Sequence, residues 1–362
     1  MTSKLGRYWR TLATGERINL LDQSLLAFLI PFALVYALVQ RLRAVMYLTG
    51  ILKTKRLPRP VLSVGNLAVG GAGKTPVTAH IARFFMGEGR RVAILSRGYG
   101  GSLEGKTAIV SDGKTISLSP EQCGDEPYML ASTIPGLMVV IGANRYEAGA
   151  LALEQFSPDI FILDDGFQHL RLHRDLNILL LDCARPFGNS RTLPAGILRE
   201  PISAAKRADI LIQTRCPEGQ ERAMFGESIP CYGSRHVISN IICINDGKAL
   251  DLISLDKTKL LAFAGIANPE FFFDGLRERG LNIASTLCFP DHARYDEKQF
   301  SKIEQTMLAT GADYAITTEK DGVKLRNLSE RFKHKILLAQ LELRFSDPES
   351  FAEALRGALR RA

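Results

Sequence analysis

VLSVGNLAVGGAGKTP occupies residues 61–76 and joins a short apolar run to a glycine-rich loop that ends in Lys74-Thr75. A helical pattern of apolar residues follows that pair. This order of strand, loop and helix is what a phosphate-binding loop requires. The glycines let backbone N–H groups approach phosphate oxygens, and the helix start adds further donors and a positive dipole end. We therefore predict that the chain binds a nucleoside triphosphate.

Individual residues of this loop have predicted roles. Lys74 is expected to reach the β- and γ-phosphates, while the Thr75 hydroxyl holds Mg²⁺. The spacing departs from the usual G-x-x-x-x-G-K-[ST], because Ala68 stands where that pattern has a glycine. An ordinary glycine-rich turn before a helix is the alternative interpretation. The residues predicted to contact the nucleotide are Gly70, Gly71, Ala72, Gly73, Lys74, Thr75 and Pro76.

The basic charge of the chain is confined to its first sixty residues. The 362 residues carry a formal net charge of +8. Residues 1–60 contain ten lysines and arginines but only two acids, so the remainder is formally neutral. A basic excess at one end is an electrostatic footprint for an anionic surface. A nucleic-acid-binding NTPase would carry basic residues along its core, so no nucleic-acid partner is expected.

The longest uncharged run lies in the same region. Residues 23–40, QSLLAFLIPFALVYALVQ, span 18 positions with Pro31 near the middle. That length is borderline for crossing a bilayer, and a proline would kink the helix. We predict a helix that lies in the membrane interface, with a buried helix or a full span as alternatives. The cations expected among anionic headgroups are Arg41, Arg43, Lys53, Lys55 and Arg56.

Cysteine usage indicates a reducing compartment. The six cysteines are scattered along the chain, and none forms a C-x-x-C pair. This pattern argues against a zinc site and against a disulfide framework.

Apolar runs of four to six residues alternate with helical patterns after the phosphate-binding loop. Such runs are typical of parallel strands buried on both faces of a sheet. Their alternation with helices predicts a doubly wound, mostly parallel α/β domain of the P-loop NTPase type. The strands expected after the first one are 91–96, 136–142, 159–163, 176–181 and 209–213.

A second, smaller α/β domain is predicted after a hairpin. Two extended segments flank Asp246-Gly247, a pair typical of tight turns. The segments expected beyond the hairpin are strands 259–264, 313–317 and 335–339 and helices 269–279, 297–310 and 347–361. The predicted boundaries are an N-terminal membrane-associated segment at 1–60, a nucleotide-binding domain at 61–228, a hairpin linker at 229–255 and the smaller domain at 256–362.

Polar residues follow the predicted strands, where parallel α/β sheets place ligand groups. Asp164 and Asp165 come directly after an apolar strand, the position of acids that hold Mg²⁺ beside a phosphate-binding loop. Capping of the following turn is the alternative role for these aspartates. His169, four residues further on, could orient a carboxylate or pack in the core.

Four further clusters carry reactive groups. Asp125 precedes a helical stretch and could cap it instead of taking part in chemistry. Arg97 could meet a phosphate and Tyr99 could stack on a sugar. Arg199 could stabilise charge on a transferred phosphoryl group, or form an ion pair within its loop. His292, beside an aspartate, could act as a general base or lie on the surface.

Six motifs, in this order, resemble the tetraacyldisaccharide 4′-kinase family, the lipid A 4′-kinases of Gram-negative bacteria. The motifs are S-V-G-N-L-A-V-G-G-A-G-K-T-P, S-R-G-Y-G-G, G-D-E-P, L-D-D-G-F-Q-H, L-P-A-G-I-L-R-E-P and F-P-D-H. The resemblance extends from the start of the chain to about residue 325. It also accounts for Ala68, since the family has a similar extended phosphate-binding loop.

The resemblance implies an enzyme of the phosphotransferase class. Its expected reaction moves the γ-phosphate of ATP, with Mg²⁺, to the 4′-hydroxyl of an acylated glucosamine disaccharide 1-phosphate in lipid A biosynthesis. The resemblance further implies two α/β domains joined by a two-stranded linker, and peripheral binding at the cytoplasmic face of the bacterial inner membrane. We expect the protein to be a monomer.

The motifs also carry over residue roles. Asp125 and His292 look like a pair in which the carboxylate orients the imidazole that takes the proton of the sugar hydroxyl. Asp165 stays open as the alternative partner of His292, and together with Asp164 it looks like a ligand of Mg²⁺. The residues implied at the nucleotide are Lys74, Thr75, Arg199 and Glu200. The residues implied near the lipid are Arg97, Tyr99, Gln168 and His169.

A membrane-attached ATPase or switch that drives a partner is the competing class. It predicts ATP hydrolysis without lipid and a large partner surface. It gives no reason for the F-P-D-H motif.

Overall fold

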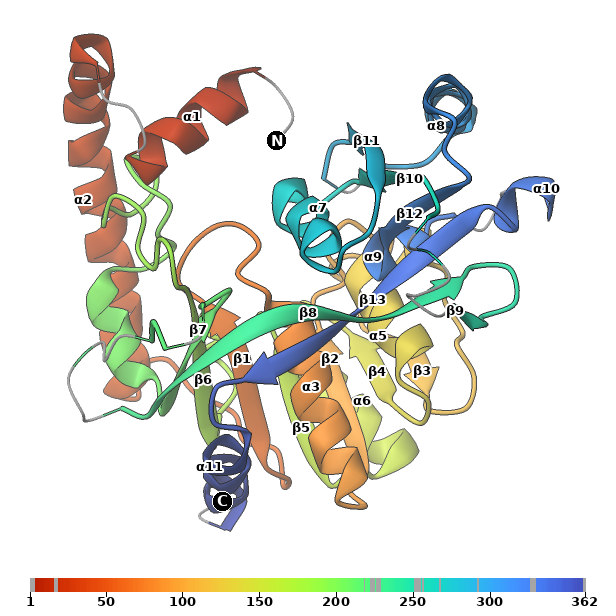
Figure 1. Ribbon diagram of the computed structural model, residues 1–362. Coiled ribbons are helices and arrows are strands. Elements are labelled where there is room, and N and C mark those ends of the chain that lie inside the picture. Colours follow the sequence, from red (N-terminus) through yellow and green to blue (C-terminus); the bar gives the residue numbers. More distant parts are fainter. Residues whose placement is uncertain are drawn as a thin grey trace. The chain divides into compact units, whose positions relative to one another are not determined.

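The computed structural model describes residues 4–15, 19–217, 219–221, 225, 229–250, 255, 257–266, 268–291, 293–325 and 330–360. The chain forms two compact units, which are coloured along the sequence in Figure 1. The larger unit comprises Ser3–Arg235 and Leu343–Ala362, and the smaller unit comprises His236–Glu342. Strands β8 (Cys231–Cys243) and β13 (Ile336–Phe345) contribute residues to both units.

The larger unit is built on a mostly parallel sheet. Its strand order is β8-β7-β6-β1-β5-β2-β4-β3, so β1 (Val61–Asn66) lies in the interior. All neighbouring strands described here run parallel except β3 and β4, which are antiparallel. The remaining strands are β2 (Val92–Ser96), β3 (Ala108–Asp112), β4 (Met138–Ile141), β5 (Ile160–Asp164), β6 (Leu176–Asp182) and β7 (Ile210–Thr214).

The five apolar runs after the phosphate-binding loop are strands within two residues of their predicted limits, which confirms the predicted α/β class. Every residue of β1, β2 and β4 is buried, because helices cover both faces of a parallel sheet. Strand β3 was not predicted. It lies at the edge of the sheet and is only partly buried, so its sequence lacks a continuous apolar run.

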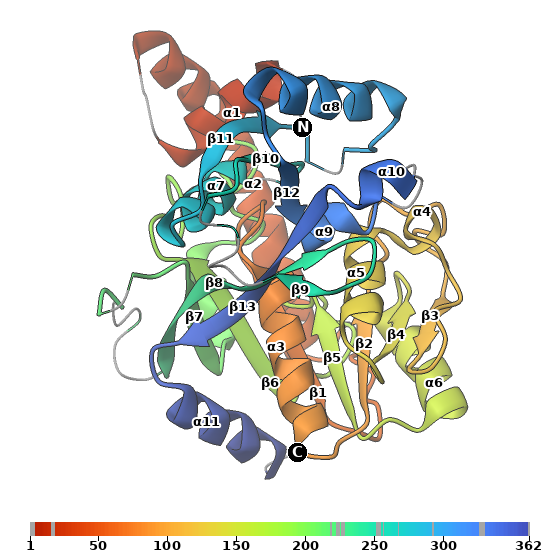
Figure 2. The same cartoon turned by 45° about the vertical axis from the view of Figure 1, so that its right-hand side comes forward.

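Helices of the larger unit pack on this sheet with their apolar faces. Helix α3 (Lys74–Gly87) packs against β1, β2 and β5 (Figure 2). It buries Ile81 and Phe85 completely. Helix α6 (Arg145–Phe156) buries Ala148 and Ala152 in a cluster with residues of β2, β4 and β5. The other helical segments here are α4 (Pro120–Cys123), α5 (Asp125–Thr133), the 3₁₀ turn η1 (Ile202–Arg207) and α11 (Pro348–Arg360).

Helix α11 returns to the larger unit from the far end of the chain. Phe351 at its start is stacked on Phe345, with ring centroids 4.1 Å apart, and His80 of α3 lies 4.9 Å from the Phe345 ring. Arg356 of α11 is ion-paired with Glu88 at 2.6 Å. The larger unit is therefore assembled from two stretches of sequence that are separated by the whole smaller unit.

Two helices precede β1 in the larger unit, α1 (Lys4–Thr14) and α2 (Leu20–Leu48). Asn19 caps α2 and forms a reciprocal pair of hydrogen bonds with Asp22. The helix continues through Pro31 for 29 residues, which is long enough to cross a bilayer. Only 11% of its most apolar window is buried, so the alternative of a buried core helix is wrong.

The exposed surface of α2 is strongly apolar. A small cluster of Leu12, Leu26, Ala33 and Ala195 attaches α2 to the rest of the larger unit. Outward-facing aromatic and aliphatic side chains cover the remaining surface: Leu20, Leu21, Leu25, Phe28, Phe32, Leu34, Val35, Leu38, Val39, Leu42, Val45 and Leu48. A surface of this kind in water is typical of an interaction site for lipid or protein.

In the smaller unit the strands are hydrogen-bonded in the order β11-β10-β12-β13, and β13 is followed in the same sheet by β8, which has residues in both units. The short strand β9 (Ala249–Leu250) pairs antiparallel with β8 across the predicted turn at Asp246-Gly247, which confirms the hairpin. The other elements are β10 (Leu260–Ala264), β11 (Ile283–Cys288), β12 (Tyr314–Thr318), α7 (Pro269–Glu278), α8 (Glu297–Thr310), α9 (Glu319–Gly322) and α10 (Glu330–Lys333). The three predicted strands and the predicted helices 269–279 and 297–310 are present here, although β13 extends to Phe345 and the edge strand β11 was missed. The helix predicted at 347–361 is α11, which belongs to the larger unit.

A disulfide joins Cys183 to Cys216, with Cα atoms 5.1 Å apart. The sequence argued against a disulfide framework, and it did not predict this single pair. The two cysteines are 33 residues apart and meet only because β6 and β7 are paired side by side, with Asp182 opposite Thr214. Local spacing of cysteines in the sequence cannot reveal such a pair. The four free cysteines among the described residues are Cys123, Cys231, Cys243 and Cys288.

Candidate active site

The phosphate-binding loop connects β1 directly to α3. Gly70 and Gly73 have φ values of 125° and 74°, which only glycine adopts without strain, and Gly73 caps the helix that begins at Lys74. Gly65 has a different task. A Cβ atom there would lie 2.7 Å from the Cβ of Phe167, so glycine permits the close approach of the D-D-G-F segment. The predicted order of strand, loop and helix is thus confirmed.

The first part of the loop, residues 67–69, is supported by residues 197–199. The Val69 N–H donates to the Ile197 carbonyl at 2.7 Å, and the Arg199 N–H donates to the Leu67 carbonyl at 2.7 Å. Ala68 forms an antiparallel bridge with Leu198. These contacts hold the side chain of Arg199 beside the phosphate-binding loop.

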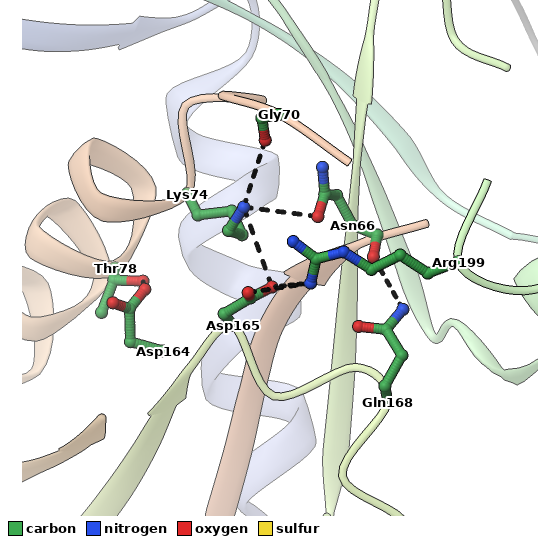
Figure 3. A network of polar contacts seen from close by, with 8 residues as sticks. All are labelled: Asn66, Gly70, Lys74, Thr78, Asp164, Asp165, Gln168 and Arg199. Atoms are coloured by element: carbon green, nitrogen blue, oxygen red, sulfur yellow. Dashed lines mark hydrogen bonds and ion pairs between the residues drawn. The ribbon is translucent and has the colours of Figure 1, made fainter. Parts of the chain in front are cut away.

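Two cations converge on Asp165 (Figure 3). Arg199 Nη1 donates to both carboxylate oxygens, at 3.1 and 2.9 Å, and Lys74 Nζ lies 3.7 Å from Oδ1. Lys74 also reaches Asn66 Oδ1 and the Gly70 carbonyl, each at 3.4 Å. Burial acts to raise the pKa of Asp165, but the charges of Lys74 and Arg199 outweigh it and lower the pKa below its ordinary value. Asp165 is therefore ionised at neutral pH.

The neighbouring carboxyl group is in a different state. Asp164 ends β5, is only 3% exposed and accepts a hydrogen bond from Thr78 Oγ1 at 3.1 Å. Burial, followed by the negative charges of Glu126 and Asp165, raises the pKa of Asp164 to about 7. Adjacent residues thus differ sharply in their affinity for a proton, because only Asp165 has cations in contact.

These oxygen donors fit Mg²⁺. Mg²⁺ prefers carboxylate and hydroxyl oxygens, and it commonly keeps water and substrate phosphates as its other ligands. Asp164 is a buried carboxyl group whose ionisation a divalent cation would favour, and Thr75 is buried at the start of α3. Among the residues that the structure describes, no group of three or more histidines, cysteines and acids could hold a metal by itself. A site with few protein ligands matches Mg²⁺ bound together with a nucleotide.

Gln168 and His169 lie beside this cluster. Gln168 Nε2 donates to the Asn66 carbonyl at 2.8 Å, which links Gln168 to the residue that also contacts Lys74. Burial, together with the charges of Arg145 and Arg174, lowers the pKa of His169 to about 4. His169 is therefore neutral at physiological pH and cannot attract an anion by its own charge.

Two glycine-rich motifs pack against each other at the start of α5. A Cβ atom at Gly101 would lie 2.4 Å from the Gln122 carbonyl oxygen, and one at Gly124 would lie 2.5 Å from the Tyr99 carbonyl oxygen. Gly124, with φ of 90°, is the cap of α5, so the alternative that Asp125 caps this helix is wrong. Arg97 pairs with Glu104 at 3.3 Å, and Tyr99 is 66% exposed, which leaves its ring accessible.

The other predicted site residues differ in placement. Glu200, predicted at the nucleotide, is 2% exposed and forms an ion pair with Arg207. Arg207 also lies 4.9 Å above the Phe167 ring, so this pair packs against the D-D-G-F segment. His292 lies outside the described residues.

Four polar residues at the site were missed by sequence reasoning: Asn66, Thr78, Arg145 and Arg215. Asn66, Arg145 and Arg215 lie at or just after the carboxyl ends of β1, β4 and β7, so the rule that found Asp164 could have found them. Arg145 is 4% exposed, and burial lowers its pKa to about 10. Thr78 lies one helical turn after Lys74 and gave no separate signal.

The chain is similar to proteins of one family along nearly its whole length. The family model described as tetraacyldisaccharide-1-P 4′-kinase matches residues 25–360. A tetraacyldisaccharide 4′-kinase of Pelobacter propionicus is 58% identical over 361 residues, covering all of both chains. One of Geobacter sulfurreducens is 53% identical over 348 residues, covering 96% of this chain and 98% of the relative.

A solved structure gives the same result for the fold. LpxK from Aquifex aeolicus in complex with ATP has a TM-score of 0.77 and 34% sequence identity, covering 92% of this chain and 99% of that one. The matches in sequence, in length and in fold place the chain in a single family. The chain belongs to the tetraacyldisaccharide-1-P 4′-kinase family.

Proposed function

We propose that this protein transfers the γ-phosphate of ATP to the 4′-hydroxyl of a tetraacyldisaccharide 1-phosphate, a step of lipid A biosynthesis. The observation that carries the proposal is the convergence of Lys74, Asp165 and Arg199 beside an extended phosphate-binding loop. The names of the family and of its relatives supply the acceptor. Phosphoryl transfer depends on positioning and charge neutralisation more than on covalent chemistry, and this cluster can provide both.

The phosphate-binding residues hold the nucleotide. Backbone N–H groups of Gly70, Gly71, Ala72 and Gly73, the start of α3 and the Lys74 ammonium bind the phosphate oxygens, and Pro76 lies in the first turn of that helix. Thr75, Asp164 and Asp165 would hold Mg²⁺, which when bound neutralises charge on the phosphates. Arg199 stabilises charge that develops on the transferred group. Glu200, which forms an ion pair with Arg207, is assigned to the nucleotide.

Asp125 and His292 activate the acceptor in this proposal. His292 takes the proton of the 4′-hydroxyl while the hydroxyl oxygen forms a bond to the γ-phosphorus. The bond between the γ-phosphorus and the β,γ-bridging oxygen breaks, and ADP leaves. Asp125 orients the imidazole. Arg97, Tyr99, Gln168 and His169 are assigned to the sugar and its substituents, where the exposed Tyr99 ring can stack.

The exposed apolar surface of α2 supports attachment to a membrane. We place the protein at the cytoplasmic face of the inner membrane, where ATP is available, as a peripheral monomer without a nucleic-acid partner. The predicted division at residues 60, 228 and 255 stays a prediction.

A radiolabel transfer assay tests the proposed function. The full-length protein, [γ-³²P]ATP, Mg²⁺ and detergent-dispersed tetraacyldisaccharide 1-phosphate should give labelled lipid, and Lys74→Ala should abolish the product. Lys114→Ala is the matched control, because that lysine is exposed near β3 and away from the loop. Lipid-independent ATP hydrolysis with no labelled lipid would instead favour the ATPase or switch.

A further inference from the structure

The phosphate-binding loop is longer than the usual one, and its extra length needs support from outside. The loop runs from Gly65 to Lys74 with Gly70 and Gly71 in the added stretch. Residues before this stretch are held by Ile197 and Leu198. Gly70 is reached by Lys74 from within the loop.

Gly71 is held by a residue far away in the sequence. Arg215 Nη2 donates to the Gly71 carbonyl oxygen at 2.8 Å and is also ion-paired with the carboxylate of Asp182. Arg215 directly follows β7, and Asp182 is the last residue of β6. The guanidinium therefore connects the glycine-rich loop to the carboxyl ends of two neighbouring strands.

The anchor of this guanidinium is rigid. Asp182 is paired with Thr214 in the sheet, and the Cys183 N–H donates to the Thr214 carbonyl at 3.0 Å. The Cys216 N–H donates to Ser234 of β8, also at 3.0 Å. Arg215 thus sits between strand ends that cannot separate easily.

Peptide geometry converts this contact into a constraint on the loop. In a planar trans peptide, the C=O of one residue and the N–H of the next point in opposite directions. Fixing the Gly71 carbonyl toward Arg215 therefore turns the Ala72 N–H away from Arg215. Glycine has no Cβ to restrict this peptide, so without an outside contact the plane would rotate easily.

We propose that Arg215 is a positioning residue that orients the Gly71–Ala72 peptide so that the Ala72 N–H faces the diphosphate of the bound nucleotide. The inference rests on the proposed nucleotide site. Arg215 acts through the loop and not by contact with the γ-phosphate. Its loss should weaken ADP and ATP equally, because both carry the diphosphate that such loops cradle.

Calorimetric titration of the full-length protein with Mg²⁺ and ATP, ADP or AMP tests this proposal. Arg215→Gln should weaken ATP and ADP binding by the same factor, about tenfold, since a hydrogen bond from a charged donor is lost. AMP affinity should change little. Arg356→Gln is the matched control, because it breaks a surface ion pair on α11 of the same unit.

Equal ADP and ATP losses support the proposal, while unchanged affinities or a loss confined to ATP would overturn it. Asp182→Asn removes the anchor and keeps the Arg215 charge. It should also weaken both nucleotides, by a smaller factor, and it decides the question if Arg215→Gln fails to fold. In the double variant the two losses should not add, because the residues act as one unit. A failure to phosphorylate lipid would refute the acceptor but leave this test intact, since it measures nucleotide binding alone.

Discussion

The phosphate-binding edge of the sheet and helix α2 differ from an ordinary protein surface in opposite ways. At the edge, Lys74 and Arg199 crowd around Asp165, and Asp164 is nearly buried. Along α2, large apolar side chains face solvent. Buried charge and exposed apolar surface both raise the free energy of the isolated protein. In the proposed function a bound partner lowers this free energy again: phosphate and metal at the edge of the sheet, and lipid at the helix.

Arg199→Gln should have the largest effect, because it removes a cation from the edge while leaving α2 intact. Turnover is expected to fall about 100-fold or more, with a small change in the KM for ATP, since the lost charge acts mainly on the transferred group. Initial rates of lipid phosphorylation measure both constants. Arg191→Gln, an exposed arginine of the same loop, is the control and should keep normal turnover. Equal turnover in the two variants would remove Arg199 from the mechanism.

Phe28→Ser with Phe32→Ser tests the other side of the comparison. Burial of one large apolar side chain in lipid contributes roughly 1.5–3 kcal/mol, so each change should weaken vesicle binding about tenfold or more. Flotation with anionic phospholipid vesicles measures this loss. Phe271→Ser is the matched control, because Phe271 is an exposed phenylalanine of the smaller unit. Phosphorylation of detergent-dispersed lipid should fall less than vesicle binding. If the variant on α2 and the control variant lose the same amount of vesicle binding, α2 is not the attachment surface.

Asp164→Asn separates the two adjacent acids. The native pKa of Asp164 is about 7, against 3.8 ordinarily, so the folded protein retains a proton that the unfolded chain releases between these values. The stability contributed by this group therefore falls as pH rises from about 4 through 7. The asparagine variant cannot ionise, and at pH 8 it should be more stable by about 1–4 kcal/mol in urea unfolding without Mg²⁺. A variant that is less stable than the unaltered protein at pH 8 would contradict the raised pKa.

His169→Gln should have the smallest effect on the free energy of unfolding. For this group, unlike Asp164, the contribution to stability increases as the pH rises. The native pKa of about 4 lies below the ordinary 6.5, so the unfolded chain binds a proton that the folded protein does not. Stability from this group therefore rises with pH between about 4 and 6.5. Urea unfolding at pH 4.5 and 7.5 measures the difference in unfolding free energy between these two pH values. This pH difference should be smaller by about 1–2 kcal/mol in the variant. An unchanged pH difference in the variant would contradict the neutral state of His169.

Features set by local sequence could be predicted, and features set by strand register could not. The buried strands follow from continuous apolar runs, and the loop from its glycines and Lys74. Asp164 and Asp165 follow from the rule that ligand groups lie after parallel strands. Their different protonation depends on burial and neighbouring acids at Asp164 and on the charges of Lys74 and Arg199 at Asp165. The contact of Arg199 with Asp165, 34 residues away, is not encoded by any local pattern.

The contact from Arg215 to Gly71 shows the limit of sequence reasoning clearly. These residues are separated by 144 positions, and their meeting depends on the placement of β7 relative to β1. The Cys183–Cys216 pair was missed for the same reason. Strands β3 and β11 were missed because edge strands, which are less buried, do not need a continuous apolar run.

The return of α11 to the larger unit has a consequence for biosynthesis. Phe345, Phe351 and Leu355 complete the apolar surface around His80 and Tyr232, yet they are synthesised only after the whole smaller unit. While the chain emerges from the ribosome, this surface of the nucleotide-binding sheet therefore stays uncovered until α11 has been synthesised. During the same interval α2, which was synthesised earlier, is already free to reach a membrane. Localisation of the nascent chain can thus precede completion of the active fold.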